Sequence, residues 1–520
     1  MNQDQSEVIA FLIKSGSGLT RTDQPDTLQT HISVIIRFAD TVLKLKRPVC
    51  FPYLDFSSPE KRYQACLKEL ALNRRTSPVL YLGVLRITRA SDGGLEFDGP
   101  GPLVDAVLRM RRFEDQALLA TMAQQGRLDT SLMTRVAMAV ADSHQHAPVA
   151  QIDNGAERFR TILALNRHSE AVSAQVLGSD LPRQLNLLLA ATIEQHTDVL
   201  NARALAGKVR HCHGDLHLGN LCLYQGEPLL FDCLEFNDEM ATIDVLYDLA
   251  FVLMDLWQFK LPALSNWVMN RYLDLADETD GLPLMPFFMA LRAAIRGQVM
   301  ATQAAQALAA GDEQRAARCT GQSMDFFRLG LQLLEPRPVV LVAVGGLSGS
   351  GKSTVASVIA HHFGPVPGAR VVSSDRLRKT QFSVSPLTRL PPQAYAADVS
   401  ARVYAEQRHQ ASQLLGSGVA VVADAVFSKP EGRDAIAACA ADAGVPFAGI
   451  WLDVPARRLL ERVAARVNDP SDADGAVVQR QLQNDVGPMN WHRVSGEGTP
   501  AEVAEAVLRH ISGCLSDQRH

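Results

Sequence analysis

The spacing of apolar and polar residues changes twice along the chain and divides it into three stretches. In the first stretch the apolar positions alternate with polar ones, which is typical of half-buried strands. One interruption, residues 59–75, has helical spacing; Ser57 or Ser58 can cap this helix, and Pro59 suits its first turn. The predicted strands are 32–37, 41–45, 79–87, 95–97 and 107–113.

The second stretch, from about residue 133 to residue 334, has helical spacing almost throughout. Two short strands, 221–224 and 228–232, interrupt it around a Gln225-Gly226-Glu227 turn. Together the first two stretches predict a small β-rich lobe followed by a large helical lobe, an α+β arrangement.

The third stretch begins after Glu335-Pro336-Arg337-Pro338, the best linker in the chain, because its prolines remove backbone donors and disfavour helix. Short continuous apolar runs then alternate with helices, which predicts a doubly wound α/β domain with a buried parallel sheet. We therefore expect two domains, residues 1–335 (small lobe about 1–110, helical lobe about 111–335) and residues 336–520. The predicted strands are 339–344, 371–374, 419–423 and 447–452, with a helix at 352–363 after the first.

Composition agrees with this plan and excludes several classes of protein. The 520 residues are too many for one hydrophobic core, and 47% hydrophobic with 21% charged residues is typical of a soluble globular protein. The net charge of −5 predicts no general affinity for nucleic acid or membranes. The eight cysteines form no CxxC pair and no zinc-ligand spacing. With no signal peptide and no apolar run of membrane-spanning length, we expect a cytoplasmic protein with reduced thiols.

The first chemical motif is His213-Gly214-Asp215-Leu216-His217-Leu218-Gly219-Asn220, followed by Phe231-Asp232. Transfer of a phosphoryl group to a hydroxyl needs a carboxylate near the acceptor proton and oxygen ligands for Mg²⁺. The Asp-x4-Asn spacing gives Asp215 as the base, with Asn220 and Asp232 as metal ligands. Cys212, His213 and His217 also fit a metal-ligand reading, but a backbone-positioning role accounts for a histidine in such a loop.

The ATP side of this site needs a strand lysine paired with a helix carboxylate. Lys44 and Lys46 both qualify, and alternation places them on the same face of the strand, so the sequence does not choose between them. Glu69, on the following helix, is the expected partner. Asp244 and Asp248 favour a structural role, capping and anchoring a helix, over metal binding.

These residues resemble those of the aminoglycoside phosphotransferase family, which includes choline and homoserine kinase-like members. The resemblance implies a protein-kinase-like fold and assigns to Asp215 the role of base and to Asn220 and Asp232 that of magnesium ligands. One departure is the missing glycine-rich loop before Lys44, where Gln29-Thr30-His31-Ile32-Ser33 stands. It predicts phosphate clamping by polar side chains, or weak ATP binding. An antibiotic substrate is not implied.

The second motif is Gly346-Leu347-Ser348-Gly349-Ser350-Gly351-Lys352-Ser353, a Gly-x4-Gly-Lys-Ser sequence between a predicted strand and a predicted helix. Glycines let backbone N–H groups wrap phosphates, the lysine reaches the β- and γ-phosphates, and the serine binds magnesium. This Walker A, or P-loop, motif predicts a second ATP site. Its expected nucleotide-binding residues are Gly346, Ser348, Gly349, Ser350, Gly351, Lys352, Ser353 and Thr354.

The residues around the second motif narrow its class to kinases of small molecules. Asp375 follows the next predicted strand. The resemblance to small-molecule kinases of this fold implies that Asp375 faces the acceptor hydroxyl and that Arg378 binds the substrate. Asp424 ends a later strand and suits water-mediated magnesium or substrate contact. Arg462 and Arg466, four apart on a predicted helix, would share one face and reach the transferring phosphate from a lid. This region resembles gluconate kinase, chloramphenicol phosphotransferase, zeta-toxin and polynucleotide kinase.

Nearly the whole chain resembles one bacterial group, a fusion of an aminoglycoside-phosphotransferase-like domain with an AAA-labelled P-loop domain. The stretches that carry this likeness include Phe51-Pro52-Tyr53-Leu54-Asp55-Phe56-Ser57 and Met110-Arg111-Arg112-Phe113. The leading hypothesis is a bifunctional, Mg²⁺- and ATP-dependent kinase of a small metabolite. Two alternatives stay open: a 5′-hydroxyl polynucleotide kinase in the C-terminal domain, and a regulatory ATPase with a kinase-like sensor domain.

Overall fold

The computed structural model describes residues 5–19, 25–30, 32–51, 54–168, 170–466 and 469–517. Of the residues quoted above, His31, Pro52 and Tyr53 lie outside these ranges. The chain forms two compact units. The first contains Met1–Ala171 and Leu189–Lys260, and the second contains Val172–Leu188 and Leu261–His520.

The first unit contains a six-stranded antiparallel sheet with the strand order β1-β2-β3-β8-β6-β7. Its core is apolar on the face that α1 covers: Val8 and Leu12 of the helix are buried with Ile36, Leu43 and Val107 of the strands. The sequence pattern did not predict α1 or β1. The elements are α1 (Ser6–Leu19), β1 (Asp26–Gln29), β2 (Ser33–Arg37), β3 (Thr41–Lys46), β4 (Cys50–Phe51), β5 (Leu54–Asp55), β6 (Tyr81–Arg89), β7 (Leu95–Phe97) and β8 (Leu103–Arg111).

Helix α2 (Pro59–Asn73) follows the hairpin of β4 and β5 and begins as its sequence predicts. The Ser58 hydroxyl accepts the backbone N–H of Lys61 at 3.3 Å, and Pro59 occupies the first turn, where its missing N–H has no partner to lose. The helix therefore carries Glu69 inward from a fixed start, with its side chain completely buried.

The rest of the first unit is mostly helical, with two small antiparallel hydrogen-bonded pairs, β10 with β11 and β9 with β12. This order of a β-rich and a helical part confirms the predicted α+β, protein-kinase-like fold class. The bounds here are α3 (Leu119–Gln124), α4 (Thr130–His146), α5 (Gly155–His168), α6 (Glu170–Leu177), α7 (Leu181–Gln195), α8 (Thr197–Leu205), β9 (Val209–His211), β10 (Leu221–Tyr224), β11 (Glu227–Leu230), α9 (Asp238–Ala241), β12 (Thr242–Asp244) and α10 (Val245–Gln258); α6 and α7 extend into residues of the second unit.

The second unit contains a five-stranded, all-parallel sheet in the order β14-β15-β13-β16-β17, which confirms the predicted α/β class of the C-terminal part. Val342 and Val344 of the central strand are fully buried with Val422 and Ile450 of its neighbours, as continuous apolar runs require. The strands are β13 (Leu341–Gly345), β14 (Arg370–Ser373), β15 (Val421–Asp424), β16 (Phe447–Asp453) and β17 (His492–Ser495).

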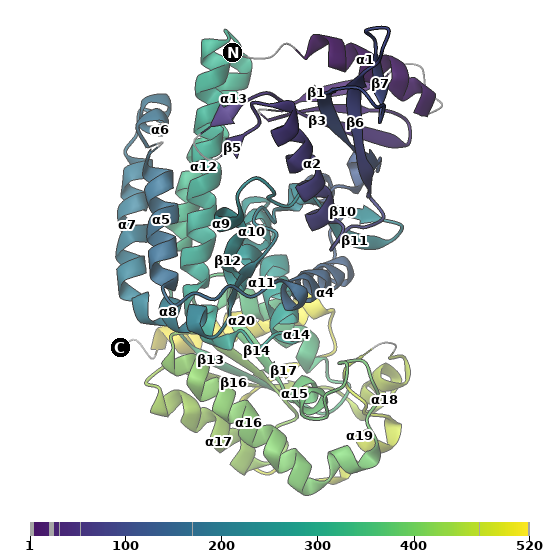
Figure 1. Ribbon diagram of the computed structural model, residues 1–520. Helices are drawn as coiled ribbons and strands as arrows, with labels where there is room; N and C mark the ends of the chain where they lie inside the picture. Colours follow the sequence, from purple (N-terminus) through teal and green to yellow (C-terminus); the bar gives the residue numbers. More distant parts are fainter. Residues whose placement is uncertain are drawn as a thin grey trace. The chain divides into compact units, whose positions relative to one another are not determined.

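Helices connect these strands and cover the sheet, and two long helices, α12 and α13, run side by side before the linker (Figure 1). The sequence pattern missed β17 because only Val494 in it is buried. The helices are α11 (Pro262–Leu273), α12 (Met285–Ala309), α13 (Glu313–Leu333), α14 (Lys352–Ile359), α15 (Ser374–Gln381), α16 (Ala397–Gly416), α17 (Pro430–Asp442), α18 (Ala456–Ala464), α19 (Gly475–Gln483) and α20 (Pro500–Asp517).

Edge strand β14 is bound along its start by side chains of α11. The Asn266 and Asn270 amides donate to the Ala369 carbonyl at 3.0 and 3.2 Å, and the Asn270 oxygen accepts the N–H of Val371 at 2.8 Å. Both asparagines are almost completely buried. Side-chain amides thus satisfy backbone groups that an edge strand would otherwise leave without partners.

One turn further along, Asp274 continues this contact with charge. Its carboxylate lies 3.0 Å from the Arg370 guanidinium and 2.9 Å from that of Arg376, at the start of α15. These contacts agree with the assignment of α11 to the second unit, whereas the predicted domain boundary after residue 335 stays a prediction.

No described helix has the length and the apolar character that crossing a bilayer requires.

Candidate functional sites

The first candidate site is organised around two lysines of β3 that share one carboxylate. The Lys44 ammonium donates to Glu69 Oε1 at 2.7 Å and to Asp232 Oδ1 at 2.5 Å. The second lysine, Lys46, pairs with the other Glu69 oxygen and with Glu235. Alternation correctly predicts that both lysines face the same way, and the structure shows that both reach Glu69.

The two lysines differ in what they can still reach. Lys46 has no exposed side-chain surface, whereas Lys44 contacts Asp232, whose side chain is 42% exposed. Burial opposes the charge on Glu69, but Lys44 and Lys46 outweigh it and lower its pKa to about 2. Burial raises the pKa of Glu235, and the charge of Lys46 offsets this only in part. Glu235 was absent from the sequence prediction; the acidic residue three positions after Asp232 was the available signal.

We expect Lys46→Met to destabilise the protein by about 3–5 kcal/mol, because it leaves Glu69 and Glu235 buried without their shared cation. The check is chemical denaturation of the full chain, followed by circular dichroism. Lys61→Met is the matched control: its ion pair with Asp55 is about half exposed, and such pairs contribute at most about 1 kcal/mol. Equal destabilisation by both substitutions would show that the buried pair has no special weight.

The segment His213–Asn220 places Asp215 beside Asn220. The Asn220 amide donates to the Asp215 backbone carbonyl at 2.9 Å and to its carboxylate at 3.0 Å. This leaves the amide oxygen of Asn220 available as a metal ligand. His217 accepts the N–H of Gly219 at 3.0 Å, so its other ring nitrogen, 3.6 Å from Asp215, can carry the proton.

Two carboxylates of α10, seven residues apart and thus on one helix face, accept hydrogen bonds from the backbone of this segment. Asp248 accepts the backbone N–H groups of His213 and Gly214 at 3.1 and 3.0 Å, and Asp255 accepts that of Leu218 at 3.0 Å. The sequence predicted an anchoring role for Asp248, but Asp255 was missed. Asp244 caps α10, as predicted: it accepts the N–H of Leu246 at 2.8 Å and pairs with buried Arg203.

The metal reading of Cys212, His213 and His217 is not the one that the geometry favours. Cys212 lies instead with His144 and Asp248, a buried group whose ligand atoms are all within 4.8 Å. Asp248 is already engaged by two backbone donors and by His144 at 3.1 Å, so we read this group as a hydrogen-bonded support.

Asp232 itself is held in a left-handed backbone conformation, with φ of +60°, which residues other than glycine seldom adopt. Its N–H donates to the Tyr81 hydroxyl at 2.9 Å, and the next N–H, of Cys233, donates to Asn73 Oδ1 at 3.0 Å. These fixed bonds keep the strained residue in place, a pattern that is common at functional sites.

The second candidate site is the phosphate loop between β13 and α14. Gly349, with φ of +90°, has no room for a side chain: a Cβ there would stand 2.7 Å from the Leu459 carbonyl. Gly351, at φ +89°, leads into α14, whose N-terminus offers unpaired N–H groups and a positive dipole. Lys352 begins this helix and is 95% buried, while Ser353 is exposed. From α19, the Gln481 side chain accepts the Ser348 N–H at 2.8 Å.

Asp424, at the end of β15, faces this loop from the neighbouring strand. It is buried, and its Oδ1 atom has no hydrogen-bond partner. Burial raises its pKa, and the charge of Lys352 and the hydroxyl of Ser353 act in the opposite direction. An orphaned buried carboxylate oxygen next to a serine hydroxyl suits a hydrated Mg²⁺, so the residues present fit the metal that the motif implies.

Among the other predicted residues, Arg462 and Arg466 differ from expectation. Helix α18 ends at Ala464, so Arg466 lies beyond it and the two do not share a helix face. Arg466 lies 3.6 Å from Asp469, whose carboxylate also accepts the N–H of Ser471 in a turn that ends the helical path. The Arg462 guanidinium donates to the carbonyls of Ser350 and Gly496, at 3.4 and 2.8 Å.

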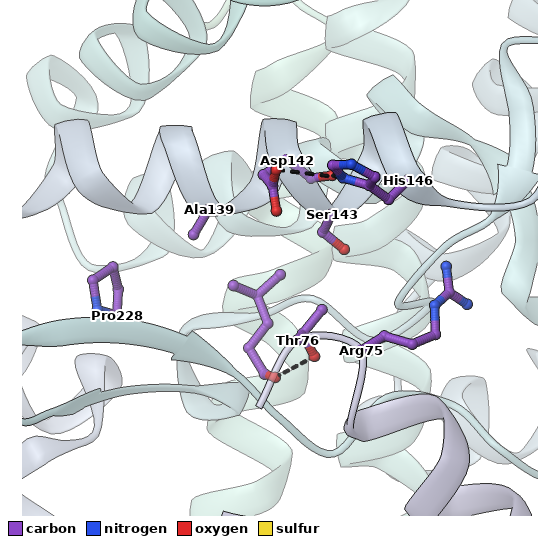
Figure 2. A pocket seen from close by; sticks show the side chains of 8 residues that line it. Arg75, Thr76, Ala139, Asp142, Ser143, His146 and Pro228 are labelled. Carbon is purple, nitrogen blue, oxygen red and sulfur yellow. Dashed lines mark hydrogen bonds and ion pairs between the residues drawn. The ribbon is translucent and has the colours of Figure 1, made fainter. Parts of the chain in front are cut away.

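A small cavity of about 150 Å³ in the first unit contains none of the predicted site residues (Figure 2). Two interactions join residues that line this cavity: the Thr76 hydroxyl donates to the Leu230 carbonyl at 2.8 Å, and the His146 ring lies 3.3 Å from the Asp142 carboxylate. It is therefore separate from the chemistry above. Its lining residues are Arg75, Thr76, Ala139, Asp142, Ser143, His146, Pro228 and Leu230.

Comparison with known proteins finds two family models on the chain. A model described as a phosphotransferase enzyme family matches residues 40–316, more than half of the chain, and one described as an AAA domain matches residues 341–486. Uncharacterized proteins from Mycobacterium bovis and Mycobacterium tuberculosis are 29% identical over 507 residues, which cover 94% of this chain and 96% of theirs.

Solved structures resemble one part of the chain at a time. A gluconokinase from Sinorhizobium meliloti is 24% identical and covers 36% of this chain and 100% of its own, with a TM-score of 0.25. A GDP complex of an aminoglycoside 2′-phosphotransferase is 15% identical and covers 63% of this chain and 99% of its own, with a TM-score of 0.37. At these TM-scores the likenesses carry no weight beyond the family models.

Proposed function

Since the chain belongs to the phosphotransferase enzyme family, we propose that it is a bifunctional ATP-dependent kinase acting on hydroxyl groups of a small metabolite. In this proposal, residues 1–335 and 336–520 are separate domains, each with its own Mg²⁺-ATP site. The observation that supports the proposal is the presence of two sets of candidate phosphate-handling residues, Lys44, Glu69, Asp215, Asn220 and Asp232 in one and the loop Gly346–Ser353 with Asp424 in the other, on two different folds.

At the first site, the Asp215 carboxylate accepts the proton of the acceptor hydroxyl as the oxygen attacks the γ-phosphorus. Lys44, held by Glu69, contacts the phosphates, because Lys46 has no exposed surface with which to do so. Asn220 and Asp232 would hold Mg²⁺, which neutralises phosphate charge when bound. The intact Lys44–Glu69–Asp232 contact supports a working kinase more than a sensor domain.

At the second site, backbone N–H groups of Gly346–Lys352 would bind phosphates, and Lys352 would carry the charge that reaches the γ-phosphate. Ser353 and, through water, Asp424 would hold Mg²⁺. Asp375, in the first turn of α15, would accept the acceptor proton. Arg462 and Arg466 remain the proposed arginines for the transferring phosphate.

Fusion of two kinases has a simple chemical benefit. When the product of one site is the substrate of the other, tethering raises its effective concentration at the second site. We therefore propose that the two sites act on one metabolite, at two positions or in sequence.

The decisive experiment is mass spectrometry of products from a metabolite-library screen, with the wild type and with Asp215→Asn and Lys352→Ala. We expect each variant to lose a different phosphorylation, so that the two accumulate different species. An identical product in equal yield from the wild type and Asp215→Asn would contradict the two-kinase proposal and favour the regulatory ATPase. Phosphorylation of an added 5′-hydroxyl oligonucleotide alone would favour the polynucleotide kinase.

A further inference from the structure

Helix α15, which carries Asp375, contains three basic residues, and only two of them have a carboxylate partner. Arg376 lies 2.9 Å from buried Asp274, and Lys379 lies 2.6 Å from Asp472, whose side chain is 9% exposed. Among the described residues, no carboxylate lies within ion-pair distance of Arg378. Arg378 is thus the one basic residue of this helix that makes no ion pair within the described residues.

Arg378 is nevertheless buried, with 6% of its surface exposed. One guanidinium nitrogen donates to the Ala394 carbonyl at 2.6 Å, and the group lies over the Tyr395 ring, 4.8 Å from its centre. Its Nε is enclosed and has no hydrogen-bond partner. A carbonyl and a ring orient a guanidinium but do not neutralise it, and a buried cation without a counter-charge is unfavourable. The site therefore calls for an anion from outside the chain.

The position of this cation links it to the acceptor. Asp375 stands three residues before Arg378, on the same face of α15. Both charges act on one neighbour: burial raises the pKa of Tyr404, the charge of Asp375 raises it further, and Arg378 lowers it. The Asp375 carboxylate and the Arg378 guanidinium thus both act on the same half-buried tyrosine.

We propose that the acceptor of the C-terminal domain is an anionic alcohol, whose carboxylate, phosphate or sulfate group pairs with Arg378 while its hydroxyl faces Asp375. This rests on the proposed function. In the transfer, the acceptor oxygen bonds to the γ-phosphorus of ATP, the bond from that phosphorus to the β,γ-bridging oxygen breaks, the hydroxyl proton goes to Asp375 and ADP leaves. A phosphate monoester that keeps a free hydroxyl belongs to this class, so such a product of the Asp215 site qualifies as a substrate.

The first test is calorimetric titration of inorganic sulfate into the full chain, with Mg²⁺-ADP at saturation to fill the nucleotide sites. Sulfate should bind to the wild type and at least about tenfold more weakly to Arg378→Met, because a charge-assisted contact is lost. Arg402→Met is the matched control: it also removes one positive charge, but from an exposed pair with Asp398. Equal affinity in Arg378→Met, or no binding to the wild type, would overturn the proposal.

The second test identifies the anion by displacement of bound sulfate from the wild type. Glycerate tests a carboxylate and glycerol 3-phosphate tests a phosphate, and the stronger competitor for the sulfate site shows which anion the site binds. Neutral glycerol should not displace the bound sulfate. No displacement by either anionic alcohol, or equal displacement by glycerol, would refute the proposal. Tighter competition by a 5′-hydroxyl oligonucleotide would also refute it and would indicate that the acceptor is a nucleic acid. Because sulfate binding requires no turnover, it stands or falls separately from the proposed transfer, which Lys352→Ala tests.

Discussion

Lys352→Ala should lower phosphoryl transfer by the C-terminal domain by roughly 10²–10³-fold, the usual effect of removing one charge-stabilising group from a transition state. The lysine is 95% buried at the first turn of α14, so its charge is not screened by water. Alanine is a good helix former and leaves the loop glycines untouched, so the fold should persist. The measurement is the rate of C-terminal product formation in an Asp215→Asn background to which the acceptor of the C-terminal site is added directly, with circular dichroism as a check on folding.

The matched control is Lys429→Ala, which removes an exposed lysine of the same domain and should leave the rate unchanged. If Lys352→Ala keeps more than a tenth of the activity while Lys429→Ala keeps all of it, the phosphate loop does not bind the ATP that donates the phosphoryl group.

Asp215→Asn should slow the transfer at the first site by about 10²–10⁴-fold, the typical contribution of a general base. The substitution keeps size and shape, and Asn220 can still donate to the remaining side-chain oxygen. What disappears is the capacity to take a proton from the acceptor. Initial rates of the N-terminal product, measured at saturating Mg²⁺-ATP, report the loss.

Asp153→Asn, an exposed loop residue of the same unit, serves as the control for the removal of one negative charge. A drop in ATP affinity with normal turnover of bound ATP would show that Asp215 acts on the nucleotide and not on the acceptor. An unchanged product rate would exclude this residue from the chemistry altogether.

Local sequence rules predicted the two fold classes and most of the strands because these depend on the spacing of apolar residues. They also bring Lys44, Glu69 and Asp232 forward as candidates, since phosphoryl transfer demands such groups in that order. They could not say how deep a side chain lies. Lys44 and Lys46 have the same local pattern, and it is the tertiary packing of Glu69, Glu235 and Phe56 around Lys46 that leaves its side chain with no exposed surface.

Supporting contacts were the hardest to predict, because they join backbone groups to distant side chains. The Asp255 carboxylate and the Leu218 N–H are 37 residues apart, and no local sequence pattern around either residue predicts this hydrogen bond. For Arg466 the error was local: helical spacing was extended past Ala464, into a segment where an aspartate turn and Pro470 oppose it.

The docking of α11 on β14 has a consequence for how such a protein can change in evolution. Helix α11 lies in the stretch matched by the phosphotransferase family model, and β14 in the stretch matched by the AAA-domain model, yet Asn270 completes the hydrogen bonding of the strand. A cut between the two matched stretches would therefore leave backbone groups of the edge strand without the partners that α11 supplies. We expect changes at Asn266 or Asn270 to be tolerated only together with compensating changes around β14.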